Sequence, residues 1–202
     1  GTIGPAIDGV PEVYAKGQGE LLDVLLAPDF GDKGGDIFVS FAQPREGGAA
    51  ATAVARGRLV LDENGGGKLD NVTTIFQQQP AIAGSSNHFG SRLIWAPDGS
   101  LFVTTGDRGD ARDEVQKPNS LIGKVINLRP DGTAAQTDPA QTGWDAKIWS
   151  MGHRNIQGAA IDPATGQLWT VEHGARGGDE LNAPQRGRNY GWPTISYSNE
   201  YF

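Results

Sequence analysis

Three short polar loops hold the residues best suited to acid–base and ionic chemistry. His88 lies in SSNHFGSRL, Asp107 in TTGDRGD, and Arg154 with Asn155 in GHRNIQG. An imidazole can act as a base near neutral pH, and a neighbouring carboxylate would fix its tautomer and raise its basicity. An arginine supplies a planar, charged donor fork for a carboxylate or a developing oxyanion. Each residue also has a structural alternative: a loop histidine, a turn-capping aspartate and an arginine in a salt bridge.

A fourth loop, EHGARGGDE, is suited to a cation. Its small residues would let backbone carbonyls approach a hard cation such as Ca²⁺, with Asp179 and Glu180 as nearby oxygen donors. A mobile acidic loop is the alternative. The three histidines of the chain all fall in these loops, but they lack the close spacing of a compact His₃ zinc site, so zinc is disfavoured.

Composition limits the class of partner. The 202-residue chain carries a net charge of −7 and has no basic run, which argues against nucleic acid or an anionic membrane as partner. It has no cysteine, which excludes disulfides, thiolate catalysis and cysteine-ligated metals. No apolar stretch approaches the roughly 20 residues of a membrane span, so membrane insertion is not expected. The 30 glycines, with 37% hydrophobic residues, indicate turns between short strands rather than disorder.

The elements that must position these loops recur at a nearly constant period. Three segments each consist of an apolar run, a turn and a second apolar run: 21–41 around Pro28, 91–107 around Pro97, and 157–173 around Pro163. Proline fixes φ, and the glycine or aspartate near it completes a turn. The prolines are 69 and 66 residues apart, and a repeat of this length is typical of a propeller.

We therefore predict an all-β fold, a β-propeller of four-stranded blades, with a β-sandwich as the alternative. The paired strands of the repeat are predicted at residues 21–26, 37–41, 93–95, 101–104, 159–161 and 168–171. Further strands are predicted at residues 52–61, 71–77 and 121–128.

Three periods make about half of a closed ring. Residues 1–202 are therefore expected to form a single partial β-propeller domain, a fragment of about three blades that lacks N-terminal and C-terminal blades. The side chains of His88, Asp107, Arg154 and His173 lie at equivalent ends of the hairpins, so we expect them to point into one cleft.

Taken together, the motifs resemble the soluble PQQ-dependent aldose sugar dehydrogenases of the quinoprotein glucose/sorbosone dehydrogenase family. The resemblance extends over nearly the whole chain, through QGELLDVLLAPDF, NHFGSRL, GDRG, GHRNIQG, EHGARGGDELN and GRNYGWP in this order. It implies a six-bladed β-propeller and an oxidoreductase that uses PQQ and Ca²⁺, acts on an aldose sugar and passes electrons to an external acceptor. It also implies a periplasmic or secreted bacterial protein, although no signal peptide is present in this chain.

The resemblance assigns roles residue by residue. His88 matches the base that takes the proton of the sugar C1 hydroxyl while hydride passes to the C5 carbon of PQQ, which yields the lactone. Asp107 matches the carboxylate that orients this histidine. Arg154 matches the arginine that hydrogen-bonds the quinone oxygen. The other cofactor-binding residues that the resemblance implies are Gln18, Asn155 and His173.

The resemblance also implies calcium. The backbone carbonyls of Gly174 and Ala175 match those that hold the Ca²⁺ next to PQQ, and Glu180 and Tyr190 match positions around a second, structural Ca²⁺ in some members. Ala27 stands where members often have a histidine, and Ala175 replaces a common proline. Neither departure removes an expected ligand, because carbonyl ligation needs no particular side chain. The family's C-terminal blades, which this chain is expected to lack, supply further basic and aromatic residues that hold the PQQ carboxylates.

Two other functions are compatible with a propeller. In a Ca²⁺-dependent lactonase-type hydrolase, Glu172 and the two acids of the loop after it would bind the metal, and no quinone would be needed. A non-catalytic extracellular propeller would bind a protein instead of a cofactor. The histidine, aspartate and arginine of the first three loops favour the enzyme over the binding protein. The hydrolase is disfavoured because no metal-binding carboxylate lies near the first inner strand.

Overall fold

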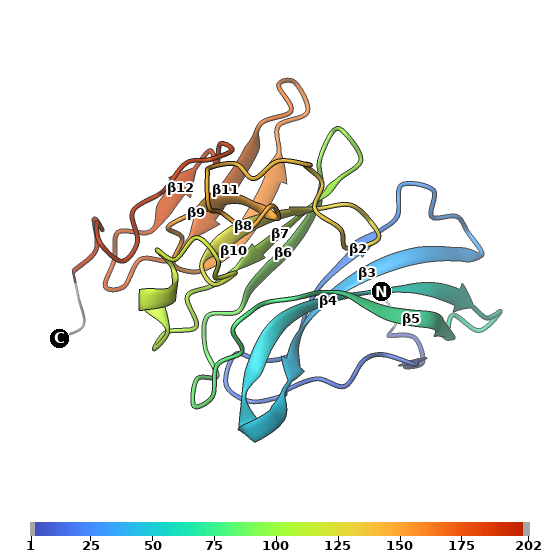
Figure 1. Cartoon of the computed structure of the whole chain (residues 1–202). Helices are drawn as coiled ribbons and strands as arrows, with labels where there is room; N and C mark the ends of the chain where they lie inside the picture. Colours follow the sequence, from blue (N-terminus) through green and yellow to red (C-terminus); the bar gives the residue numbers. More distant parts are fainter. Residues whose placement is uncertain (1–2, 200–202) are drawn as a thin grey trace.

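A computed structural model describes residues 3–199, which form three sheets that follow one another along the chain (Figure 1). The first sheet has the order β1-β5-β4-β3-β2, the second β6-β7-β8-β9, and the third β10-β11-β12. The strands are β1 Ile7–Asp8, β2 Leu21–Leu26, β3 Gly34–Pro44, β4 Ala50–Leu61, β5 Gly67–Gln77, β6 Gly90–Trp95, β7 Leu101–Thr105, β8 Lys124–Leu128, β9 Ile148–Met151, β10 Ile156–Ile161, β11 Leu168–Glu172 and β12 Glu180–Asn182. Two one-turn 3₁₀ helices cover Glu46–Gly48 and Arg112–Glu114.

The first strand of each repeat is the innermost one. β2, β6 and β10 each form an edge of their sheet, and β6 contacts both β2 and β10. Side chains join these edges: the Leu93 backbone N–H donates to Asp23 Oδ2 at 3.0 Å, and Arg92 Nε donates to the Gln157 carbonyl at 2.7 Å. Sheets that meet along their inner strands are the blades of a propeller, so the predicted fold class is confirmed.

The hairpins predicted around the three prolines are all present, as β2–β3, β6–β7 and β10–β11. The second sheet is a four-stranded blade. The first sheet has four antiparallel strands and gains β1, which pairs with β5 in parallel, while the third sheet has three strands in the described part of the chain.

One strand prediction needs correction. The strand predicted at residues 121–128 begins only at Lys124, because Gly123 has a φ of +65° and the Leu121 backbone N–H donates to the Gln79 carbonyl, outside the sheet. Strands β1, β9 and β12 were not predicted. The four residues of β9 lie among turns, with no flanking alternation to reveal them.

The central sheet is buried on both faces because a sheet packs against each of them. Within β7, Leu101 and Val103 join a cluster with Phe38 and Val54 of the first sheet. Phe102, which points the other way, packs with residues that include Leu168 of the third sheet. Successive side chains of a strand alternate between its two faces, so this five-residue strand anchors both neighbours. Each fully buried side chain of this kind stabilises the fold by about 1.5–3 kcal/mol.

No helix of the described residues has the length and apolar character needed to cross a membrane.

The long connection between β7 and β8 is held by Lys124, which is fully buried at the start of β8. Its Nζ donates to the carbonyls of Val115 and Ile122, both at 2.7 Å. Burial lowers the pKa of Lys124 to about 7, although the nearby charge of Glu114 opposes the shift.

This burial predicts a pH-dependent stability. Between pH 7 and 10.5 the unfolded chain holds the lysine proton and the folded chain does not, so the free energy of unfolding should rise with pH in this window. Lys124→Met should flatten that rise. It should also destabilise the fold by about 1–3 kcal/mol, because it leaves two buried carbonyls without a donor. Urea unfolding at several pH values measures both effects. The matched control is Lys117→Met, since Lys117 forms only an exposed pair with Glu114; an equal effect of both variants would contradict the prediction.

Candidate active site

The β6–β7 hairpin brings together the first two predicted site residues. His88 precedes β6 and Asp107 follows β7, so the antiparallel pairing places them side by side. His88 Nδ1 lies 2.7 Å from Asp107 Oδ1. The Asp107 carboxylate is only 1% exposed, and it also accepts the Gly109 backbone N–H and the Trp192 indole N–H, each at 2.8 Å. Three donors therefore fix its orientation.

This carboxylate also fixes the chemistry of His88. An ionised carboxylate can only accept hydrogen bonds, so it selects the tautomer of the neutral imidazole that has the proton on Nδ1 and the lone pair on Nε2. The His88 side chain is 18% exposed, which leaves the ring accessible to a small molecule. In this arrangement Nε2 can take a proton from an alcohol, and the imidazolium that forms lies against the carboxylate.

Arg108 holds the loop that carries His88. Its guanidinium lies 3.4 Å above the centre of the Phe89 ring, and Nη2 donates to the Ser85 carbonyl at 2.8 Å. Burial lowers the pKa of Arg108 to about 10, against the opposing influence of Tyr14 and Asp107. His88 and Arg108 have φ values of +52° and +59°, which non-glycine residues seldom adopt. Strained backbone of this kind persists where packing imposes it, often at functional sites.

Arg154 joins the second and third sheets. Its backbone carbonyl accepts the Asp107 N–H at 2.7 Å, and its backbone N–H donates to Glu172 Oε2 at 2.6 Å. Its guanidinium lies 5.3 Å from the Trp192 ring and donates through Nη1 to the His173 carbonyl at 3.0 Å. Arg154 is 9% exposed, and its buried Nε has no hydrogen-bond partner among the described residues. The fork therefore has a donor to offer to a ligand.

A second histidine–carboxylate pair repeats the first one in the third sheet. His153 Nδ1 lies 2.9 Å from Glu172 Oε1, and both pairs are separated by 19 residues in sequence. His153 is fully buried, its Nε2 lies 2.8 Å from Ser150 Oγ, and its ring stacks on Tyr190 at 4.9 Å. Both ring nitrogens are thus occupied. His153 has a structural role, and the described residues contain no cluster of three acidic or histidine side chains suited to a metal.

Glu172 is the centre of this second pair. Besides His153 and the Arg154 backbone, the carboxylate accepts the Asn182 amide at 2.9 Å. Burial by itself raises the pKa of Glu172, but the charge of His153 and these hydrogen bonds outweigh it, so the pKa lies below its ordinary value. A carboxylate with three internal partners is not available to bind the metal that a lactonase-type hydrolase would need from it.

A cleft of about 350 Å³ opens beside this network, and Gln18, Asn155 and His173 are among the residues that line it. Gln18 Oε1 accepts the His88 backbone N–H at 2.9 Å. Asn155 Oδ1 accepts the Gly90 backbone N–H at 3.2 Å. The structure therefore brings Gln18, Asn155 and His173 together, next to the connected group of His88, Asp107 and Arg154. Of the four side chains predicted to share one cleft, His173 lines this one and the other three lie beside it, so the shared cleft and the role of each residue stay predictions.

The residues predicted to bind calcium are distributed over the same end of the third sheet. Gly174 donates its backbone N–H to Asp179 Oδ1 at 2.9 Å, and Ala175 packs in a cluster with Trp192. Glu180 starts β12 and accepts the Asn182 amide at 2.9 Å. The Tyr190 hydroxyl donates to the Ala183 carbonyl at 2.8 Å. Glu180 and Tyr190 thus have separate partners, and their place in a calcium site stays a prediction.

Sequence reasoning missed Trp192, whose indole contacts both Asp107 and Arg154. It lies 85 residues after Asp107 in the chain, so no local spacing could connect the two. The signal that could have found it is the GRNYGWP motif, which is rich in turn residues yet contains two aromatic ones. Arg108 and His153 were likewise visible as motif residues without an assigned role, and Glu172 was considered only as a metal ligand of the alternative hydrolase.

All 202 residues match the Glucose / Sorbosone dehydrogenase family, and the chain belongs to this family. Among its relatives is the aldose sugar dehydrogenase YliI of Escherichia coli (strain K12), 42% identical over 197 residues, which are 96% of this chain and 52% of the relative. A crystal structure of a glucose dehydrogenase is 46% identical, covers 96% of this chain and 55% of its own, and superposes with a TM-score of 0.88.

A third similar protein was solved with a cofactor. The PQQ-bound aldose sugar dehydrogenase of Streptomyces coelicolor is 32% identical, with a TM-score of 0.77 over 94% of this chain and 52% of its own. The chain spans about half the length of the curated relatives it matches. These similarities support the sugar dehydrogenase class that the motifs suggest.

The Glu172 network predicts an acid-labile contribution to stability. Because the folded-state pKa is lowered, this contribution is fully present above the ordinary value of 4.5 and is lost as the pH falls through the folded-state pKa. Glu172→Gln should therefore remove part of the acid sensitivity. It should also destabilise the protein by about 3 kcal/mol at neutral pH, because the amide removes the buried charge and replaces one accepting oxygen with a donor that faces another donor.

Denaturant unfolding between acidic and neutral pH measures both effects. Glu180→Gln is the matched control, since this partly exposed carboxylate accepts only the Asn182 amide in the described network. Its effect should stay below about 1 kcal/mol. Equal losses for the two variants would show that Glu172 does not organise the site.

Proposed function

We propose that the natural protein, at its full length, is a PQQ- and Ca²⁺-dependent aldose dehydrogenase that oxidises the sugar at C1 to the lactone. The observation that carries the proposal is the accessible His88 imidazole held by the buried Asp107 carboxylate at 2.7 Å. Family membership and the PQQ-bound relative support the same class. The three sheets would be three blades of a six-bladed propeller, in a periplasmic or secreted protein that passes electrons to an external acceptor.

The residues beside the cleft fit a planar quinone. Arg154 has a buried Nε without a partner in the described structure, and a guanidinium fork suits quinone or carboxylate oxygens. Gln18, Asn155 and His173 would hold the rest of the group from the walls of the cleft. When bound, PQQ supplies an ortho-quinone carbon that accepts a hydride.

We assign His88 as the general base that takes the proton of the sugar C1 hydroxyl. Loss of a hydride from C1 leaves a cationic centre unless the C1 hydroxyl proton leaves as well. In the proposed step the C1–H bond breaks with its electron pair, Nε2 of His88 takes the hydroxyl proton, and C1 forms a double bond to oxygen. Asp107 stabilises the imidazolium that results, and the Trp192 and Gly109 N–H groups keep that carboxylate in place.

We assign calcium to backbone oxygens. Ca²⁺ prefers oxygen ligands, and, as the family resemblance implies, the backbone carbonyls of Gly174 and Ala175 would hold the ion near the cofactor. Glu180 and Tyr190 would contribute to a second, structural Ca²⁺. This second site would require both side chains to change the contacts that they make in the present structure.

The base assignment predicts a specific kinetic defect. His88→Ala in the full-length protein should lower turnover by about two to four orders of magnitude, the usual contribution of a general base, and should leave PQQ affinity nearly unchanged. Dye-linked aldose oxidation with PQQ and Ca²⁺ measures the rate. Combined with Asp107→Asn, the loss should not exceed that of the His88 variant alone, because the pair acts as a unit. Turnover near the wild-type rate would remove His88 from the mechanism.

The cofactor assignment predicts a binding defect that needs no turnover. Arg154→Lys keeps the charge but loses the planar fork, so the dissociation constant for PQQ should rise about tenfold or more. Absorbance titration of the full-length apo-protein with PQQ, without sugar, measures it. The control is Arg58→Lys, at an exposed arginine of β4 that is paired with Asp36. If both variants bound PQQ like the wild type, Arg154 would not be a cofactor ligand.

A further inference from the structure

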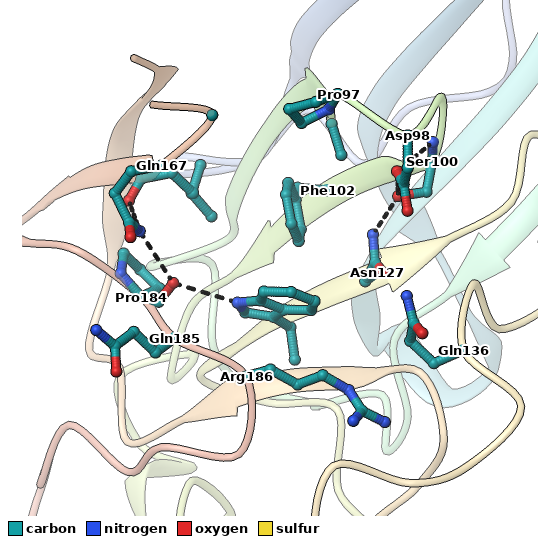
Figure 2. A pocket seen from close by; sticks show the side chains of 14 residues that line it. Pro97, Asp98, Ser100, Phe102, Asn127, Gln136, Gln167, Pro184, Gln185 and Arg186 are labelled. Carbon is teal, nitrogen blue, oxygen red and sulfur yellow. Dashed lines mark hydrogen bonds between the residues drawn. The ribbon is translucent and has the colours of Figure 1, made fainter. Parts of the chain in front are cut away.

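A second cavity lies at the opposite end of the hairpin that carries the candidate active site. It sits between the second and third sheets, beside the turn at Pro97 and Asp98 (Figure 2). The five residues of β7 separate it from Asp107 by about 17 Å of strand. Its volume is about 320 Å³. Sites for small molecules start at about 300 Å³, so the cavity suits a ligand no larger than a single sugar ring.

Asn127, one of the residues that line the cavity, has a buried side-chain oxygen without a hydrogen-bond partner among the described residues. Ser100 Oγ donates to Asp98 Oδ1 at 2.6 Å and accepts the Asn127 Nδ2–H at 2.8 Å, as the dashed line in Figure 2 shows. Because the Ser100 hydroxyl already donates its proton to Asp98, it can only accept from Asn127, so the Nδ2–H₂ group of the Asn127 amide must face Ser100. Its Oδ1 is therefore left as the free atom, and it is buried without a hydrogen-bond partner in the part of the chain described. A buried, unpaired carbonyl is stabilised by any ligand that brings a hydroxyl to it.

Another part of the lining is aromatic. Phe102 and Trp149 both line the cavity and meet edge to face, with ring centres 5.1 Å apart. The indole N–H of Trp149 already donates to the Pro184 carbonyl at 3.2 Å, so what the pair presents to a ligand is apolar ring surface. The negative face of an aromatic ring attracts the weakly positive C–H groups of a sugar ring.

The charges of the lining cancel. Among the described residues that line it, only Asp98 and Arg186 are ionisable, one of each sign, and the remaining polar side chains are hydroxyls and amides such as Gln136 and Gln167 (Figure 2). Amides both donate and accept, which matches hydroxyl groups rather than an ion. We propose that this cavity is a second binding site, for a neutral polyhydroxylated molecule the size of a monosaccharide. The proposal goes beyond the proposed function and does not depend on it, because no residue of the cavity belongs to the catalytic group.

Ligand binding can be followed at Trp149 without any activity. D-glucose and myo-inositol are titrated as probes into the full chain without PQQ, and the indole ¹H–¹⁵N signal of Trp149 is monitored, assigned by its loss in Trp149→Phe. We expect a saturable shift with a dissociation constant on the order of millimolar for both probes. Gluconate, which is anionic, should bind at least tenfold more weakly. No saturable shift with either neutral probe, or tighter binding of gluconate, would overturn the proposal.

Two variants locate the binding. Asn127→Leu removes the free acceptor at similar volume, and Gln136→Trp fills the cavity from a partly exposed loop position, so it should fold even if the buried Asn127 variant does not. Each should weaken glucose binding at least tenfold. Gln77→Trp, on exposed β5, is the matched control and should change nothing. His88→Ala should also leave this shift intact. If the shift were lost in the His88 variant but kept in Gln136→Trp, the sugar would bind only at the catalytic cleft and the proposal would fail.

Discussion

The Asp107 carboxylate is the point at which three separate parts of the chain meet. It accepts from His88 on the loop before β6 and from the Trp192 indole near the end of the described chain, while its backbone N–H binds the Arg154 carbonyl before β10. A carboxylate that is 1% exposed is stable only if such donors replace water. The same requirement that makes the buried charge tolerable therefore assembles the candidate site.

The second and third sheets each carry a histidine–carboxylate pair, and the surroundings of each pair decide its role. His88–Asp107 and His153–Glu172 have the same spacing and the same Nδ1 contact. The ring of His153 is covered by Ser150 and Tyr190. The His153–Glu172 pair therefore supports the Arg154 backbone, whose N–H donates to Glu172. Around His88 the described residues provide no such cover, and the side chain is partly exposed. One motif thus serves as scaffold in one blade and as candidate base in the next.

The second sheet links the candidate site to the polar groups at the opposite end of the same hairpin. β7 is buried along its whole length, with Leu101 and Val103 on the first sheet and Phe102 on the third. Its C-terminal end leads to Asp107 and its N-terminal end to the Asp98–Ser100–Asn127 chain of hydrogen bonds. A single rigid strand therefore sets the geometry of polar groups at both ends, and packing on two faces leaves it little freedom to shift.

The sequence by itself determined the repeat and the chemistry available to it. Turn residues around Pro28, Pro97 and Pro163 act locally, so the hairpins were predictable, as were the polar loops at their ends. Only the tertiary structure decided that His153 is enclosed while His88 stays partly exposed, that Trp192 reaches Asp107, and that the Asn127 side-chain carbonyl is left unpaired among the described residues. It also decided where β8 begins and that β9 exists. These outcomes depend on contacts between distant segments and on burial, which no local spacing encodes.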